Sequence, residues 1–74
     1  MPKLPALKPR EVEKMLEKAG FVHVRQKGSH RIYEKGNFLV IVPYHNKDLR
    51  RGTLGSIIKQ SGLTVDEFLL LRKH

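Results

Sequence analysis

Residues 27–33 read Lys27-Gly28-Ser29-His30-Arg31-Ile32-Tyr33, and this stretch decides how the middle of the chain folds. Gly28 and Ser29 form a turn signal between two segments of alternating polar and apolar residues, a pattern typical of antiparallel strands. We therefore predict one strand over residues 21–27 and a second over residues 30–35. The same stretch holds a histidine among cations, so the turn is also the first candidate for a functional site.

A second hairpin follows directly. Gly36 and Asn37 mark another tight turn, and the apolar run over residues 38–42 is predicted as a third strand that ends at Pro43. A polar, basic loop then continues from residue 44 to residue 52. The sequence thus predicts three short antiparallel strands joined by two tight turns.

Helices are expected on either side of these strands. Residues 9–19 carry one apolar stripe at helical spacing, with Pro9 in the first turn and Gly20 as the stop. A short helix is predicted over residues 54–61, capped by Thr53, and a capping box at residues 64–67 opens a last helix. The order α-β-β-β-α-α predicts a small α+β domain over residues 1–74, with helices on one face of the sheet and residues 1–8 as an irregular lead-in.

The lengths of the two turns set the expected register of the sheet. Two-residue loops place His30 opposite Lys27 on one side and opposite Pro43 on the other, and they place His23 opposite Glu34. One face should then be basic with a small apolar floor: His23, Arg25, Lys27, His30, His45, Ile32, Leu39 and Ile41. The other face should pack on the helices: Val22, Val24, Tyr33, Phe38, Val40 and Val42. This register makes His30 and His45 diagonal neighbours at the open end of the hairpin.

The charge of the chain indicates its partner. Fifteen lysines and arginines against seven acidic residues give a formal charge of +8, which favours a polyanion, first nucleic acid and then an acidic protein. There is no cysteine, which excludes disulfides and thiol catalysis. No apolar run approaches a membrane span or a signal sequence, and we expect a cytoplasmic protein without a cofactor.

Two histidines near a basic surface are suited to cleavage of RNA. One imidazole takes the proton of the 2′-hydroxyl while the other assists the leaving 5′-oxygen, and neighbouring cations stabilise the charge that develops on phosphorus. His30 and His45 are the predicted catalytic pair. The predicted RNA contacts are Lys27, Arg25, Arg31, Lys47, Arg50 and Arg51.

Other chemistry is less well supported by the sequence. Ser29 is a poor nucleophile candidate because neighbouring strand residues point to opposite faces and no acid has a fixed relation to His30. A metal site would need ligands beyond the two histidines, and Asp48 and Glu34 are poorly placed for that role.

Several anchors in this order and spacing resemble the HicA family of toxins, the mRNA-interferase half of HicA–HicB toxin–antitoxin pairs. They run over nearly the whole chain: residues 16–21, Gly28-Ser29-His30, Val42-Pro43-Tyr44-His45, Gly52-Thr53-Leu54, residues 57–62 and Glu67-Phe68-Leu69. The resemblance implies a fold similar to the double-stranded-RNA-binding domain. It also implies metal-independent and ribosome-independent cleavage of mRNA, growth arrest, His30 as the catalytic residue, and neutralisation by a HicB antitoxin that covers the site.

Two rival interpretations use the same basic surface. A non-catalytic double-stranded-RNA-binding module would recognise RNA by shape and would need no histidine pair. A protein-binding domain would dock its basic face on an acidic partner.

Overall fold

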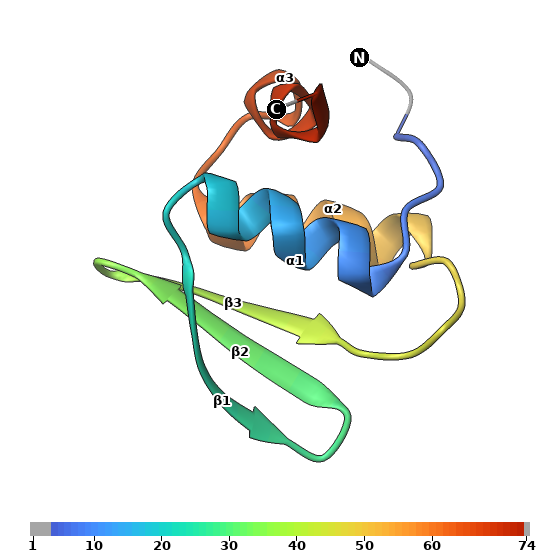
Figure 1. Cartoon of the computed structure of the whole chain (residues 1–74). Helices are drawn as coiled ribbons and strands as arrows, with labels where there is room; N and C mark the ends of the chain where they lie inside the picture. The colour runs from blue at the N-terminus through green and yellow to red at the C-terminus, as the bar shows by residue number, and fades with distance from the viewer. Residues whose placement is uncertain (1–3, 74) are drawn as a thin grey trace.

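The sheet of the molecule consists of three antiparallel strands in the order β1-β2-β3 (Figure 1). The computed structural model describes residues 4–73, and its elements follow the predicted order α-β-β-β-α-α with a final 3₁₀ turn. Their bounds are α1 Pro9–Lys18, β1 Val22–Lys27, β2 His30–Lys35, β3 Phe38–Pro43, α2 Arg51–Ser61, α3 Val65–Leu70 and η1 Leu71–Lys73. The predicted α+β fold is confirmed.

The helices form layers above one face of the sheet. Both α1 and α2 contact β3, and α3 lies on their far side, away from the strands (Figure 1). No described helix covers the opposite face of the sheet, so that face is open. The predicted arrangement of helices on a single face is therefore confirmed.

The core lies between the sheet and the helices and is built from each of these elements. Val12, Met15 and Leu16 face it from α1, as the apolar stripe predicted. Phe68 is the largest fully buried side chain. The remaining buried residues of this cluster are Leu7, Phe21, Tyr33, Val40, Val42, Leu49, Leu54, Ile57 and Ile58.

The lead-in segment contributes more than the sequence indicated. Its described part, residues 4–8, is irregular as predicted, and residues 1–3 lie outside the described range. Leu7 is nevertheless fully buried, and its carbonyl accepts a hydrogen bond of 2.8 Å from the Leu49 backbone N–H. This bond ties the start of the chain to the segment before α2.

The hairpin of β2 and β3 has the predicted register. His30 pairs with Pro43, Tyr33 with Val40 and Lys35 with Phe38. Gly36 sits in the turn with φ of 58°, a left-handed conformation that glycine adopts without steric cost. The two-residue loop inferred from Gly36-Asn37 is therefore correct.

The hairpin of β1 and β2 departs from the prediction at one point. Lys27 pairs with His30 and Arg25 with Ile32 as expected, but a β-bulge between His23 and Arg25 shifts the rest of the strand. His23 consequently pairs with Tyr33 rather than with Glu34, and its ring centroid lies 5.3 Å from that of Tyr33. The prediction of His23 on the open face was wrong because one extra residue, Val24, interrupts the alternation.

The bulge also corrects the predicted inner face. Val22 pairs with Glu34 and is 62% exposed, and Val24 is 46% exposed, so neither packs in the core. Phe38 was also expected inside, but it is the first residue of β3, lies beside Gly62 and is half exposed. The face that packs on the helices is therefore smaller than predicted.

Helix α2 begins earlier than predicted. Leu54 donates its backbone N–H to the Arg50 carbonyl at 2.9 Å, so residues 51–53 already form the first helical turn and Thr53 is not the cap. Leu49 and Leu54, both in the core cluster, have the spacing of a hydrophobic staple around the Arg50 cap. Gly62 ends the helix as predicted, with φ of 77°.

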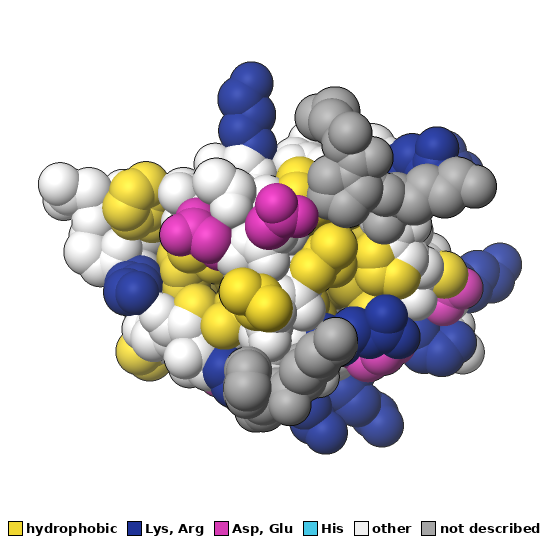
Figure 2. All heavy atoms as spheres, turned by 90° about the horizontal axis from the view of Figure 1, so that it is seen from above, with side chains coloured by type: hydrophobic (Ala, Val, Ile, Leu, Met, Phe, Trp, Pro, Cys, Tyr) yellow, Lys and Arg dark blue, Asp and Glu magenta, His cyan; other side chains and the backbone are white. Residues whose placement is uncertain are grey.

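Helix α3 starts at the predicted capping box. The Glu67 N–H donates to the Thr64 hydroxyl at 3.1 Å, and the Thr64 N–H donates to the Glu67 carboxylate at 2.8 Å. Seen from the α3 side, the surface mixes apolar side chains at its centre with lysines and arginines around the rim (Figure 2). Among the described residues, no helix has the length and apolar character needed to cross a bilayer.

Candidate functional site

His30 occupies the position on which the predicted site depends. It is the first residue of β2, lies in the central strand between Lys27 and Pro43, and is exposed. Strand alternation places it on the same face as Ile32, which pairs with Ile41 and Arg25. The open face thus presents a histidine at the end of an apolar floor.

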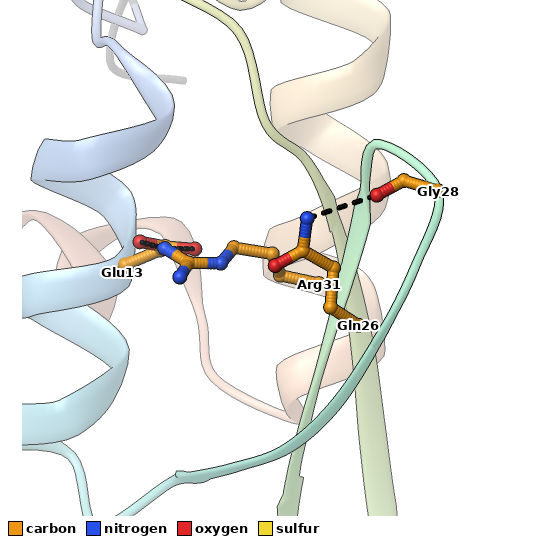
Figure 3. A network of polar contacts seen from close by, with 4 residues as sticks. All are labelled: Glu13, Gln26, Gly28 and Arg31. Carbon is orange, nitrogen blue, oxygen red and sulfur yellow. Dashed lines mark hydrogen bonds and ion pairs between the residues drawn. The ribbon is translucent and has the colours of Figure 1, made fainter.

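The turn before His30 is held by side-chain and backbone constraints. Gln26 donates from Nε2 to the Gly28 carbonyl at 2.9 Å (Figure 3), and Gly28 itself has φ of 61°. The pairing of Lys27 with His30 closes the hairpin directly after this turn. The backbone of His30 is therefore fixed, while its side chain remains free to meet a ligand.

Arg31 points toward Glu13 on α1 (Figure 3), and strand alternation puts it on the opposite face of the sheet from His30. Its Nη1 donates to both carboxylate oxygens of Glu13, at 3.0 and 3.3 Å, and its guanidinium carbon lies 4.4 Å from the centroid of the Tyr44 ring. The Glu13 side chain is only 8% exposed and that of Arg31 29%. Arg31, predicted as an RNA contact, thus has structural partners that position strand β2 against α1.

Tyr33 completes this buried group. Burial, together with the nearby Glu13 carboxylate, raises the pKa of the Tyr33 hydroxyl far above its usual value. The hydroxyl therefore stays neutral and adds no negative charge that would compete with Glu13 for Arg31.

His45 lies just beyond the end of the sheet. The ladder continues for one bond past the strands, because the Tyr44 N–H donates to the Ser29 carbonyl at 2.6 Å. His45 is exposed, and its Nδ1 accepts a hydrogen bond of 3.2 Å from the Lys47 N–H. Since β3 ends at Pro43, face alternation does not extend to His45, and its position on the face of His30 stays a prediction.

The Ser29–Tyr44 bond nevertheless brings the two histidines into one region. Each of the bonded residues is the direct neighbour of a histidine, Ser29 of His30 and Tyr44 of His45. Arg31, on the other side of His30, contacts the same tyrosine. The segments that carry the two candidates are therefore joined by a backbone bond and by a cation–π contact.

The other predicted RNA contacts are all exposed. Arg25 and Lys27 lie on β1, and Lys47 lies in the loop after β3. Arg50 caps α2, and Arg51 is its first residue. These cations therefore lie on the strand before His30, in the loop after His45 and at the start of α2.

A hollow lies beside His45. It has a volume of about 400 Å³ and is formed by the first turn of α1 and the loop after β3; its lining residues are Lys8, Arg10, Glu11, Tyr44, His45 and Asn46. His30 is not among them. Within residues 4–73, no cluster of three or more histidine, aspartate or glutamate side chains is arranged to hold a metal ion.

The strands, the candidate histidines and α1 and α2 all lie within a segment that matches a known family. A family model described as the HicA toxin of bacterial toxin–antitoxin systems matches residues 9–63, from the first residue of α1 to just past the end of α2. The chain belongs to the HicA toxin family. No curated protein matches the sequence. The match covers every strand, both histidines of the candidate pair and the loop between them, so this HicA chain is the toxin member of a toxin–antitoxin system and has an antitoxin as its partner.

Sequence reasoning missed the residues that connect the site to the helices. Glu13 looks like one of several acidic residues on a solvated helix face, and nothing in its spacing distinguishes it. The register did hold a signal for Arg31, since its partner Val42 belongs to the inner face. Nothing in the sequence indicated that Lys8 and Arg10 lie near His45, because only the packing of the lead-in against the loop after β3 brings them there.

Proposed function

We propose that this HicA toxin is an endoribonuclease that cleaves mRNA without a metal ion, with His30 as its proton-transfer residue. The observation that carries the proposal is the exposed position of His30. It begins β2 and is paired with a strand on each side, in a chain of the HicA family. Lys27 faces His30 across the hairpin, and Lys47 is held next to His45 through its backbone, so both cations are candidates for the phosphate.

The proposed reaction is an internal transfer at phosphorus. His30 takes the proton of the 2′-hydroxyl, the 2′-oxygen forms a bond to phosphorus, and the bond from phosphorus to the 5′-oxygen breaks. The 5′-oxygen takes up one proton from solvent as it leaves, and His30 afterwards returns its proton to solvent, so the products are a 2′,3′-cyclic phosphate and a 5′-hydroxyl. Lys27, Lys47 and the arginines at positions 25, 50 and 51 stabilise the added negative charge.

His45 has an assisting role in this scheme. Its Nδ1 accepts the Lys47 N–H, so the neutral ring carries its proton on Nε2. Nε2 can therefore donate a hydrogen bond to a phosphate oxygen or to the leaving 5′-oxygen. Arg31 is left out of the RNA contacts because Glu13 and Tyr44 already engage it.

The test of the proposal is the substitution His30→Ala in the full chain, with RNA cleavage and growth inhibition as readouts. Both should be lost, while binding of single-stranded RNA stays within several-fold of the wild type. His23→Ala is the matched control: it also removes an exposed histidine from the sheet, but one paired with Tyr33 away from the site. Wild-type protein that leaves RNA intact in the presence of chelator would contradict the catalytic proposal and favour a non-catalytic double-stranded-RNA-binding module.

We further propose that the antitoxin partner is of the HicB type and acts by covering the His30 region in the cytoplasm. The open sheet face, with His30, Lys27 and Arg25 around exposed Leu39 and Ile41, suits a partner with apolar and acidic groups. A purified HicB-type protein should bind the toxin and suppress RNA cleavage in proportion to its occupancy. Binding that leaves cleavage unchanged would place the antitoxin elsewhere.

A further inference from the structure

The hollow beside His45 is not explained by the proposed reaction. Four kinds of side chain meet in it: two cations, Lys8 and Arg10; a tyrosine and a histidine ring; the Asn46 amide; and one carboxylate, Glu11. Such a combination is what a nucleotide requires, because its phosphate needs positive charge, its base needs an apolar or aromatic surface, and the edge of the base needs a donor and an acceptor.

We propose that this hollow binds one unpaired nucleotide of the RNA substrate, adjacent to the phosphate that is cleaved. The inference rests on the proposed endoribonuclease function and adds to it a binding site for one base of the substrate. A volume of about 400 Å³ is in the range of small-molecule sites and suits one nucleotide. A base inside a duplex cannot enter, because it would have to leave its partner and its stacked neighbours.

The base would stack on a ring that is already held in place. The Arg31 guanidinium carbon lies 4.4 Å from the centre of the Tyr44 ring, and Arg31 in turn donates a hydrogen bond to the Glu13 carboxylate. The Tyr44 backbone is fixed as well, through its bond to Ser29. Because the ring is ordered before the ligand arrives, stacking on it costs little conformational entropy.

The cations of the hollow are available to a phosphate. Lys8 forms an ion pair of 3.5 Å with Asp48, but both side chains are more than half exposed, so this pair is weak and exchangeable. Arg10 is exposed and forms no ion pair within residues 4–73. The one carboxylate of the lining, Glu11, accepts the Lys8 backbone N–H at 3.2 Å at the start of α1, which occupies one of its oxygens.

The position of the hollow fixes which nucleotide it would hold. His45 lines it and is also the proposed donor to the scissile phosphate, so the bound nucleotide directly adjoins that phosphate. Asn46 follows His45 and offers both a donor and an acceptor to a base edge. Asn46 is therefore the residue through which this site would favour some bases over others.

The first experiment is an NMR titration of the full-length His30→Ala protein with nucleoside 5′-monophosphates and, separately, with ribose 5-phosphate. We expect the amide signals of residues 44–46 to shift with nucleotides and to shift clearly less with ribose 5-phosphate, which lacks a base. Equal shifts would reduce the hollow to a phosphate contact and overturn the proposal. Absence of shifts at residues 44–46 would overturn it as well.

Variants then test the individual contacts. Arg10→Ala should weaken nucleotide binding about fivefold, the upper end of what one solvent-exposed charge pair contributes. Lys59→Ala, an exposed cation near the end of α2, removes the same charge away from the hollow and should leave binding within twofold. Asn46→Ala should change the bases at which single-stranded RNA is cut, and an unchanged cleavage pattern would remove Asn46 from base recognition.

The two proposals fail in different ways. If the wild type cleaves RNA but nucleotides leave residues 44–46 undisturbed, the nucleotide site is wrong and the endoribonuclease stands. If nucleotides bind at residues 44–46 but no RNA is cleaved, the endoribonuclease is wrong and the hollow is a nucleotide site of an RNA-binding protein.

Discussion

At the scale of single residues, the adjacent residues His30 and Arg31 point to opposite faces of the sheet. His30 points to the open face of the sheet and is free, whereas Arg31 points to the helices and is held by Glu13 and Tyr44. One donor of Arg31, its Nε atom, is buried without a partner, which shows how much of the guanidinium is withdrawn from water. The ion pair thus anchors the strand that carries the catalytic candidate.

Loss of the Glu13 carboxylate should destabilise the fold. In Glu13→Gln the Arg31 charge remains mostly buried without a counter-charge, and we expect the free energy of unfolding in urea to fall by about 1–3 kcal/mol. The control Glu17→Gln makes the same change on the same helix at an exposed position and should stay within about 0.5 kcal/mol of the wild type. Equal losses of unfolding free energy in both variants would mean that the loss comes from removing one negative charge from α1 and not from breaking the ion pair of Glu13 with Arg31.

At the scale of elements, the two edges of the sheet are protected in different ways. On β3 the Ile41 N–H, which is not used by the ladder, donates to the Gln60 side chain of α2 at 3.0 Å. On β1 the bulge between His23 and Arg25 interrupts the regular spacing that another strand would need for pairing. The bulge also sends His23 to the side of Tyr33 and Val22 to the open face.

The junction of α2 and α3 leads to a prediction at this scale. Gly62 has φ of 77°, and a Cβ there would lie 2.5 Å from Cε1 of the Phe38 ring. Gly62→Ala should cost about 1–2 kcal/mol for the left-handed backbone and a further amount for the displaced ring. Gly36→Ala, at φ of 58° with open space around it, should show the backbone cost alone in urea unfolding.

A double substitution separates the two contributions. In the background Phe38→Ala the ring is absent, so Gly62→Ala should cost no more than Gly36→Ala does in the wild type. If the larger cost persists without the ring, the excess arises in the α2 cap itself and not in its contact with β3.

At the scale of the whole molecule, charge and shape act together. The chain has a formal charge of +8, and five of its cations lie on β1 beside the uncovered sheet face, in the loop after β3 and at the start of α2: Arg25, Lys27, Lys47, Arg50 and Arg51. The side of α3 shows a mixture of apolar, acidic and basic side chains instead (Figure 2). A polyanion is therefore expected to approach from the strands and the loop after β3.

Salt dependence measures this approach. Binding of single-stranded RNA to the inactive His30→Ala protein should weaken as salt increases, and adding Lys47→Ala should reduce the slope of log K against log salt by about 0.7, the value for one lost phosphate contact on a single strand. Lys59→Ala in the same background should leave the slope unchanged. A slope that Lys47→Ala does not alter would remove this lysine from the RNA contacts.

Much of the fold was predictable because it depends on local signals. These signals act within a few residues, so a single sequence reveals them. They are the glycines at turn positions, the apolar stripe of Val12, Met15 and Leu16, and the capping box at Thr64. The register of β2 with β3 followed from one two-residue loop. The errors concern the bulge at Val24, the burial of Leu7 and the start of α2. The last two adjoin a contact between distant segments, because Leu49, just before α2, donates a hydrogen bond to Leu7.

The sequence by itself determined the order of the elements, the turn that presents His30 and the basic character of the chain, because turn chemistry, periodicity and charge are properties of neighbouring residues. The tertiary structure alone decided that Arg31 joins Glu13 and Tyr44 instead of facing solvent, and that Lys8 and Arg10 meet His45 around a hollow. The physical reason is that both arrangements join segments far apart in the chain, α1 and its lead-in with the strands and the loop after β3. Such contacts form only when the core places these segments side by side.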